Sequence, residues 1–173
     1  MQGGGNIKEQ GNSQTLLVYY SNEGSTREVA RGISKRLPCE LLELQPVQDV
    51  PDSKFLKYLY GGKQVFLKET PKLSSYEIQP ENYDLLILGT PVWAGSYAPV
   101  IRSFIRNHFF QNQKFALFCT YRGQAMSALD KLTELVSHKD NQVITQMDIK
   151  EEILKKPDQL NQKVDEFINM LNK

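Results

Sequence analysis

Short apolar runs alternate with amphipathic segments along most of the chain. Residues 15–20, 84–89 and 114–119 are almost wholly apolar, as expected for strands that are buried on both faces of a parallel sheet. Two weaker runs, at 40–44 and 142–147, predict two further strands. Apolar and polar residues alternate at 40–44, which is typical of an edge strand with one solvated face.

Between these strands, apolar residues recur at helical spacing. We expect one helix after the first strand, ended by Pro38, and another capped by Ser96 with Pro99 in its first turn. A third helix is expected around residues 126–136, and Pro157 opens a last one. The alternation predicts an α/β fold: a doubly wound five-stranded parallel sheet in the order 2-1-3-4-5, with helices on both faces.

The pattern predicts a single domain over residues 15–173, preceded by a mobile polar tail at 1–14 that is rich in Gly, Asn and Gln. Residues 51–83 break the alternation and are expected to form a long irregular connection between the second and third strands. Such a connection can act as a functional lid or contact surface, or can simply cover the sheet edge. Its apolar patch at 65–67 could support a homodimer or pack on its own domain.

Charge and composition exclude several classes of protein. The 173 residues include 21 Lys and Arg and 20 Asp and Glu, and the net charge of +1 argues against broad electrostatic binding of nucleic acid or anionic membranes. No apolar run reaches the ~18 residues of a membrane span, and the N-terminus lacks the apolar stretch of a secretory signal. We therefore expect a cytoplasmic protein.

The only cysteines are Cys39 and Cys119. In the predicted strand order they lie three strands apart, which separates them by about 14 Å. A disulfide requires Cα atoms within about 7 Å, so we expect two free thiols. Neither the cysteines nor the two histidines, His108 and His138, fall in a metal-binding spacing, and no metal site is expected.

Three loops are expected to form a ligand site, because ligands bind beyond the carboxyl ends of parallel strands where the strand order reverses. Residues 21–26 follow the first strand and lead into a helix, where a phosphate would be favoured, although Ser and Thr are also ordinary helix caps. Residues 90–95 carry the only tryptophan, Trp93, which would either contact a ligand or close the core. Residues 120–124 add a second aromatic side chain, Tyr121.

Together, three segments resemble the flavodoxins and flavodoxin-like FMN proteins. They read YYSNEGSTREVARGI, DLLILGTPVWAG and FALFCTYRGQ, and the resemblance extends from about residue 15 to the end. It implies FMN as the cofactor, with its phosphate on the first loop and its isoalloxazine flanked by Trp93 and Tyr121. The chain departs from the family at Glu23, where a hydroxyl residue is usual, so that only the backbone N–H of Glu23 suits a phosphate. The implied FMN-binding residues are Ser21, Asn22, Glu23, Gly24, Ser25, Thr26, Thr90, Pro91, Val92, Trp93, Ala94, Gly95, Thr120, Tyr121, Arg122 and Gly123.

The resemblance also implies a function, which is electron transfer through a bound flavin to a redox partner protein or a small electron acceptor. The peptide between Ala94 and Gly95 would lie near flavin N5. Two alternatives stay open: a small FMN-dependent NAD(P)H/quinone-type oxidoreductase, and a flavodoxin-fold protein-interaction module that has lost its cofactor. The net charge of +1 differs from the strongly acidic electron-shuttle flavodoxins. The sequence GGK at 61–63, together with a proline and GTPVWAG, is similar to a flavodoxin-like subgroup. Its members are generally described only as flavodoxin family proteins, so the subgroup does not identify a substrate.

Overall fold

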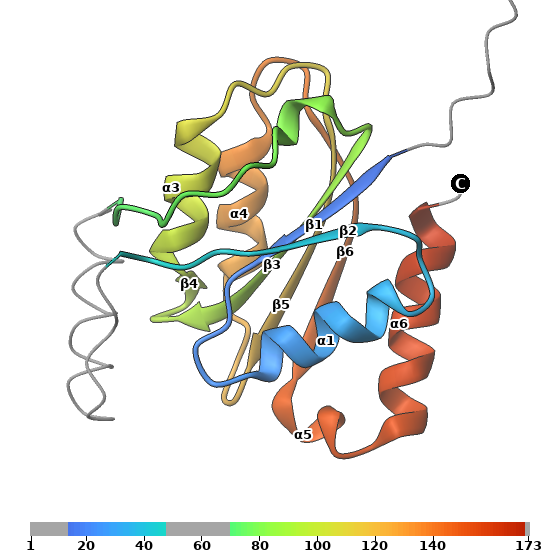
Figure 1. Cartoon of the computed structure of the whole chain (residues 1–173). Helices are drawn as coiled ribbons and strands as arrows, with labels where there is room; N and C mark the ends of the chain where they lie inside the picture. The colour runs from blue at the N-terminus through green and yellow to red at the C-terminus, as the bar shows by residue number, and fades with distance from the viewer. Residues whose placement is uncertain (1–13, 48–69, 172–173) are drawn as a thin grey trace, which may run out of the picture.

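A six-stranded sheet forms the centre of the protein (Figure 1). The computed structural model describes residues 14–47 and 70–171. The parallel strands follow the order β2-β1-β3-β5-β6, and the short β4 pairs antiparallel with the end of β3. This confirms the predicted order of the five parallel strands and adds one short strand. The strands are β1 (Thr15–Tyr19), β2 (Glu40–Glu43), β3 (Leu85–Trp93), β4 (Ser96–Tyr97), β5 (Lys114–Tyr121) and β6 (Gln142–Lys150).

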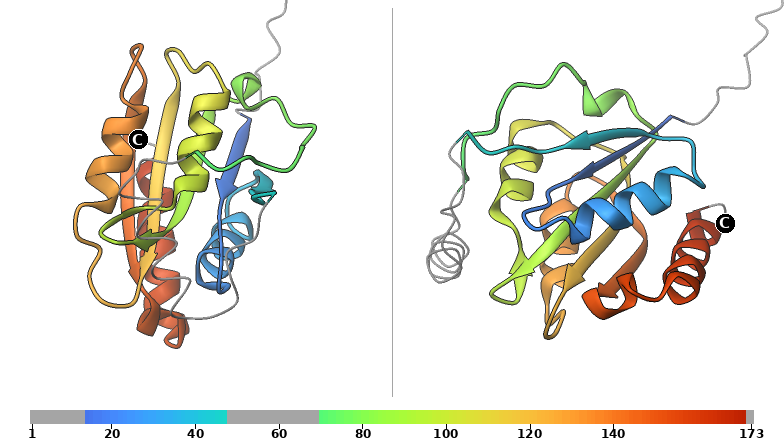
Figure 2. Two further views of the ribbon diagram at one scale, coloured as in Figure 1. Left: turned by 90° about the vertical axis from the view of Figure 1, so that its left-hand side faces the viewer. Right: turned by 60° about the horizontal axis from the view of Figure 1, so that its bottom comes forward.

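Helices cover both faces of the sheet, as predicted (Figure 2). They are α1 (Ser25–Ser34), α3 (Pro99–Asn107), α4 (Ala128–Val136), the short α5 (Glu151–Leu154), α6 (Pro157–Leu171) and a 3-10 turn, η1 (Pro80–Asn82). On one face, α1 and α6 contribute Val29 and Phe167 to a buried cluster. On the other face, α3 and α4 contribute Phe104 and Leu132 to a second one. No helix in the described part of the chain is long and apolar enough to cross a membrane.

The continuous apolar runs are explained by the position of β1, β3 and β5 at the centre of the sheet. Successive side chains of a strand point to opposite faces, so Leu16 belongs to the cluster under α3 and α4, and Leu17 to the cluster under α1 and α6. Both side chains are fully buried. The expected edge strand is β2, where Leu41 remains 39% exposed.

The helix start predicted at Ser96 is wrong, because β3 and β4 form a hairpin at this point. Trp93 pairs with Ser96, and the two residues between them, Ala94 and Gly95, have φ angles of 47° and 68°. A two-residue hairpin loop with positive φ at both positions is a type I′ turn, whose twist matches that of its strands. The next helix, α3, begins at Pro99 as expected.

The described part of the long connection, from residue 70, runs along the β2 edge and packs on α3. Leu73 pairs with Pro46 in an antiparallel bridge. Farther along, the His108 ring joins Tyr76 and Glu81, with Nε2 2.7 Å from the tyrosine hydroxyl and Nδ1 2.7 Å from Glu81 Oε1. The apolar patch at 65–67, the GGK sequence and residues 1–13 of the expected tail lie outside the described residues.

Both cysteines are free thiols, as predicted. Cys119 is fully buried on β5, and burial, with a smaller effect of the Asp148 charge, raises its pKa to about 12. Cys39, just before β2, is partly buried, and burial raises its pKa to about 11. Since the thiolate is the reactive form, neither thiol is poised for nucleophilic chemistry at neutral pH.

Candidate functional site

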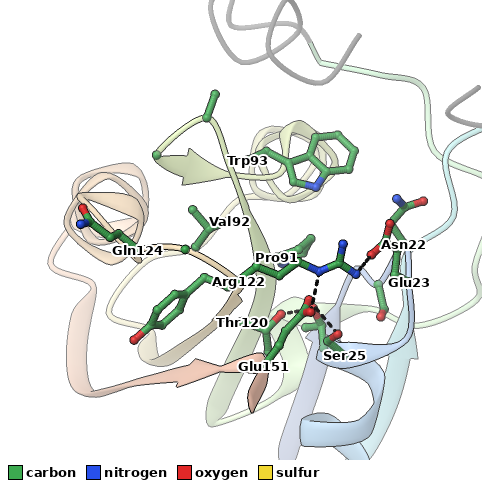
Figure 3. A pocket seen from close by; sticks show the side chains of 16 residues that line it. Asn22, Glu23, Ser25, Pro91, Val92, Trp93, Thr120, Arg122, Gln124 and Glu151 are labelled. Atoms are coloured by element: carbon green, nitrogen blue, oxygen red, sulfur yellow. Dashed lines mark hydrogen bonds and ion pairs between the residues drawn. The ribbon is translucent and has the colours of Figure 1, made fainter. Parts of the chain in front are cut away.

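The three predicted loops converge on one cavity of about 360 Å3 beyond the carboxyl ends of β1, β3 and β5 (Figure 3). Volumes of roughly 300–1,000 Å3 are usual for small-molecule sites. All the residues predicted for the site line it, except Gly24 and Thr90. Gln124, the last residue of the predicted third loop, also lines the cavity, and Glu151 is the one described lining residue that lies outside all three predicted loops.

Gly24 and Thr90 shape the cavity from behind its surface. The φ angle of Gly24 is 99°, a left-handed conformation that glycine adopts without strain, and this residue ends the loop before α1. Thr90 is fully buried, and its Oγ1 accepts a hydrogen bond from the Ala98 amide at 2.9 Å. This bond ties the base of the hairpin to the start of α3.

The first loop presents a helix N-terminus to the cavity. Ser21 Oγ accepts hydrogen bonds from the amides of Gly24 and Arg27, both at 3.2 Å, and so closes the loop. First-turn amides lack intrahelical acceptors, and those of Ser25 and Thr26 have no acceptor among the described residues. With the positive end of the helix dipole, these amides make this end of the cavity suitable for an anion.

Arg122 spans the cavity from the third loop to the first (Figure 3). Its Nη2 donates to Glu23 Oε2, and its Nε donates to Glu151 Oε2 at 2.7 Å. The other oxygen of Glu151 accepts a hydrogen bond from Ser25 Oγ at 2.9 Å. Two carboxylates and one guanidinium therefore meet beside the N-terminus of α1, and the Ser25 hydroxyl is already donated to a protein group.

The aromatic side of the cavity is formed by Trp93 at the end of β3 (Figure 3). Its ring is partly exposed and meets the ring of Tyr20 edge to face, with 5.7 Å between centroids and 84° between planes. Trp93 therefore lines the site, and it also packs against the buried cluster under α3 and α4. In the adjacent turn, the Gly95 carbonyl accepts hydrogen bonds from Lys131 Nζ at 3.0 Å and Ser127 Oγ at 3.3 Å.

Tyr121 is held in one orientation by β6. Its hydroxyl donates to Asp148 Oδ2 at 2.8 Å, and this bond, followed by burial and the Asp148 charge, raises the pKa of Tyr121 to about 12. The phenol therefore stays neutral at physiological pH. Its ring forms part of the cavity lining, while its hydroxyl is held by Asp148, which does not line the cavity.

Glu151 escaped the sequence analysis because β6 is longer than expected. The apolar pattern ended the last strand at 147, whereas β6 continues to Lys150, which is paired with Tyr121. The residue after a parallel strand reaches the same edge as the loops after its neighbours. A longer predicted strand would have placed Glu151 at the site. The last residues of β6 alternate between polar and apolar, so the hydrophobic pattern did not indicate where the strand ends.

The described lining of the cavity consists of carboxylate, hydroxyl, amide, guanidinium, apolar and aromatic groups. No histidine or cysteine lines the cavity among the described residues. Within residues 14–47 and 70–171 there is also no cluster of three or more His, Cys, Asp or Glu side chains that could hold a metal. The cavity combines an anion-binding end with an aromatic side, an arrangement suited to a planar ligand that carries an anionic group.

Comparisons with known proteins find flavoproteins and a flavodoxin with the same fold. The flavoprotein from Lactobacillus acidophilus NCFM, solved in complex with FMN, is 24% identical, with a TM-score of 0.68 over 83% of this chain and 97% of that one. A putative flavoprotein from Bacteroides uniformis ATCC 8492 is 20% identical, with a TM-score of 0.70 over 83% and 96% of the two chains. The Fusobacterium nucleatum flavodoxin bound to flavin mononucleotide is 13% identical, with a TM-score of 0.58 over 92% and 96%.

These structures show the shared fold. No curated protein matches the sequence significantly. A sequence profile of the flavodoxin family matches residues 14–165, which is most of the chain. The chain therefore belongs to the flavodoxin family.

Proposed function

We propose that the protein binds FMN in the cavity between the three loops and transfers electrons through the bound flavin. The observation that carries the proposal is the position of Trp93 and the N-terminus of α1 in the lining of one cavity. A phosphorylated planar cofactor needs an aromatic surface for its ring and an anion-binding site for its phosphate. The two must be no farther apart than the length of the cofactor. The complex of the Lactobacillus acidophilus flavoprotein with FMN supports this assignment.

The phosphate end of the cavity fits FMN through neutral donors. The amides of Ser25 and Thr26 and the dipole of α1 would hold the phosphate without requiring a lysine. Arg122 is the one basic side chain in the described lining. Its guanidinium could add a charge-assisted hydrogen bond once it exchanges a carboxylate partner for the phosphate.

The end of the cavity near Trp93 fits the isoalloxazine through aromatic side chains and exposed backbone. Trp93 and Tyr121 would flank the isoalloxazine, and the type I′ turn brings backbone atoms of Ala94 and Gly95 to the cavity wall. Lys131 and Ser127 donate hydrogen bonds to the Gly95 carbonyl. In this turn, the Ala94 carbonyl would therefore be the one to contact the isoalloxazine ring. When bound, the flavin supplies the redox chemistry, and these residues orient it and limit its contact with water.

The electron acceptor would approach at the rim of the cavity, near Met126. Met126 is 71% exposed and packs beside Gly95. A Cβ on Gly95 would lie 2.9 Å from the Met126 sulfur. An exposed, flexible apolar side chain next to the cofactor suits a redox partner protein or a small acceptor. The proposal includes either kind of electron acceptor.

Two experiments test the proposal and its alternatives. FMN that co-elutes with the protein in gel filtration at one equivalent supports the binding site, whereas FMN that separates completely contradicts it and favours an interaction module without cofactor. The loaded protein is then mixed with NAD(P)H and a quinone. Slow turnover that rises only with an added reductase supports a carrier, and fast turnover without one supports the oxidoreductase.

A further inference from the structure

The carboxylate of Glu151 lies at the end of the cavity that suits an anion. Ser25 Oγ donates to one of its oxygens at 2.9 Å, and Arg122 Nε donates to the other at 2.7 Å (Figure 3). Ser25 is the first residue of α1, so the carboxylate lies beside a helix N-terminus. The dipole of the helix favours a negative charge at this point.

This carboxylate uses the same kinds of donor that a phosphate would use. A hydroxyl on a helix N-terminus and a guanidinium are common phosphate ligands. Glu23 takes a second position on Arg122, so two carboxylates face one cation. An entering phosphate would meet excess negative charge unless one carboxylate moves away, because like charges at close range repel each other.

We propose that Glu151 is an intramolecular substitute for the phosphate of the cofactor and that an anionic ligand must displace it. The inference rests on the proposed function and concerns the same cavity. Displacement releases the Ser25 hydroxyl and the Nε of Arg122 from Glu151, so that both can donate to the phosphate, while Glu23 keeps its position on Nη2. Glu151 therefore sets how strongly the site prefers phosphorylated flavin, since it competes with FMN and leaves unphosphorylated riboflavin unaffected.

The position of Glu151 in the fold permits this exchange. It is the first residue of α5 and follows Lys150, whose backbone is fixed by pairing of β6 with β5. Its side chain is 27% exposed, so rotation toward water is open to it without movement of the strand. The neighbouring Glu152 is 60% exposed and pairs with Lys150 at 2.9 Å, away from the cavity lining.

The test compares dissociation constants for FMN and riboflavin in the full chain and in three variants. Glu151→Gln keeps the shape and removes the charge, Glu151→Ala removes the competing group, and Glu152→Gln is the matched control. Removal of a charge-assisted competitor is expected to tighten FMN binding about tenfold in both Glu151 variants. Riboflavin affinity should stay unchanged, and Glu152→Gln should match the parent for both ligands.

A second readout uses inorganic phosphate, whose stabilising effect is measured as a shift in melting temperature. The shift should be larger in the Glu151 variants than in the parent chain and in Glu152→Gln. Equal affinities in all chains, or weaker FMN binding in both Glu151 variants, would overturn the inference. If no chain binds either flavin, the proposed function fails, and the phosphate shift alone decides: equal shifts overturn the role of Glu151 and larger shifts in its variants support it.

Discussion

The hydroxyl oxygens of Thr26 on α1 and Thr120 at the end of β5 lie 2.8 Å apart in a hydrogen bond. The two residues are 1% and 2% exposed, and the bond joins the first and third loops of the cavity across 94 positions of sequence. Each hydroxyl can donate or accept. When Thr120 donates, the proton of Thr26 stays available to a ligand.

This pair should stabilise the fold as well as the site. Thr120→Val leaves the buried hydroxyl of Thr26 without its partner, which should lower the free energy of unfolding by about 1–3 kcal/mol. Thr26→Val should have a similar effect. The double variant should lose clearly less than the sum of the two, because no unpaired hydroxyl remains. Urea denaturation of the four chains measures this coupling, and strictly additive losses would show that the bond contributes nothing.

Gly89 must be glycine because of Phe118, the residue opposite it on β5. A Cβ at Gly89 would lie 2.2 Å from the Phe118 ring, so Gly89→Ala should displace this fully buried ring and cost about 1–3 kcal/mol of stability. Gly123→Ala is the matched control, since a Cβ there meets nothing within 4 Å. Thermal unfolding compares the two variants, and equal melting temperatures would contradict this account.

The sequence predicted those parts of the fold that burial dictates. Strands such as β1 are apolar on both faces, and Pro99 and Pro157 mark helix starts that the structure confirms. The hairpin at Ala94 and Gly95 could not be predicted, because alanine at positive φ carries no sequence signal of a type I′ turn.

The same limit applies to the site. The strand order alone places the loops that follow the apolar strands at one edge of the sheet. These loops contain nearly all of the residues that line the cavity. Glu151 follows β6, whose last residues alternate between polar and apolar. The hydrophobic pattern therefore did not indicate that this strand extends to Lys150. The ion pairs of Arg122 depend on side-chain directions, and these are set by packing.

Cys119 should make stability depend on alkaline pH. Its pKa is raised to about 12 in the folded state from an ordinary 9.0, so folding holds the thiol proton. The contribution is complete below pH 9 and is lost as the pH rises toward 12, because the unfolded chain then releases the proton first. Urea denaturation at pH 8 and pH 10.5 should show a larger loss for the parent chain than for Cys119→Ala. An identical loss in both chains would contradict the assignment.

Lys131 should tune the bound flavin through the turn it contacts. Its Nζ lies 3.0 Å from the Gly95 carbonyl at the cavity wall, so Lys131→Met removes a positive charge near the ring. Reduction adds electrons to the flavin, and the midpoint potential should become more negative by roughly 10–30 mV. Lys114→Met, at the opposite end of β5, is the control. Equal potentials for parent and Lys131→Met would exclude this effect.

The central claim, that FMN occupies the cavity beside Trp93, is tested most directly by fluorescence titration. Trp93 is the only tryptophan in the chain, so its emission reports on this site alone. FMN should quench it along a saturating curve with one equivalent at the end point, and Trp93→Phe should abolish the signal while FMN still co-elutes. A Trp93 emission that stays constant through excess FMN, after correction for absorbance, would contradict the account.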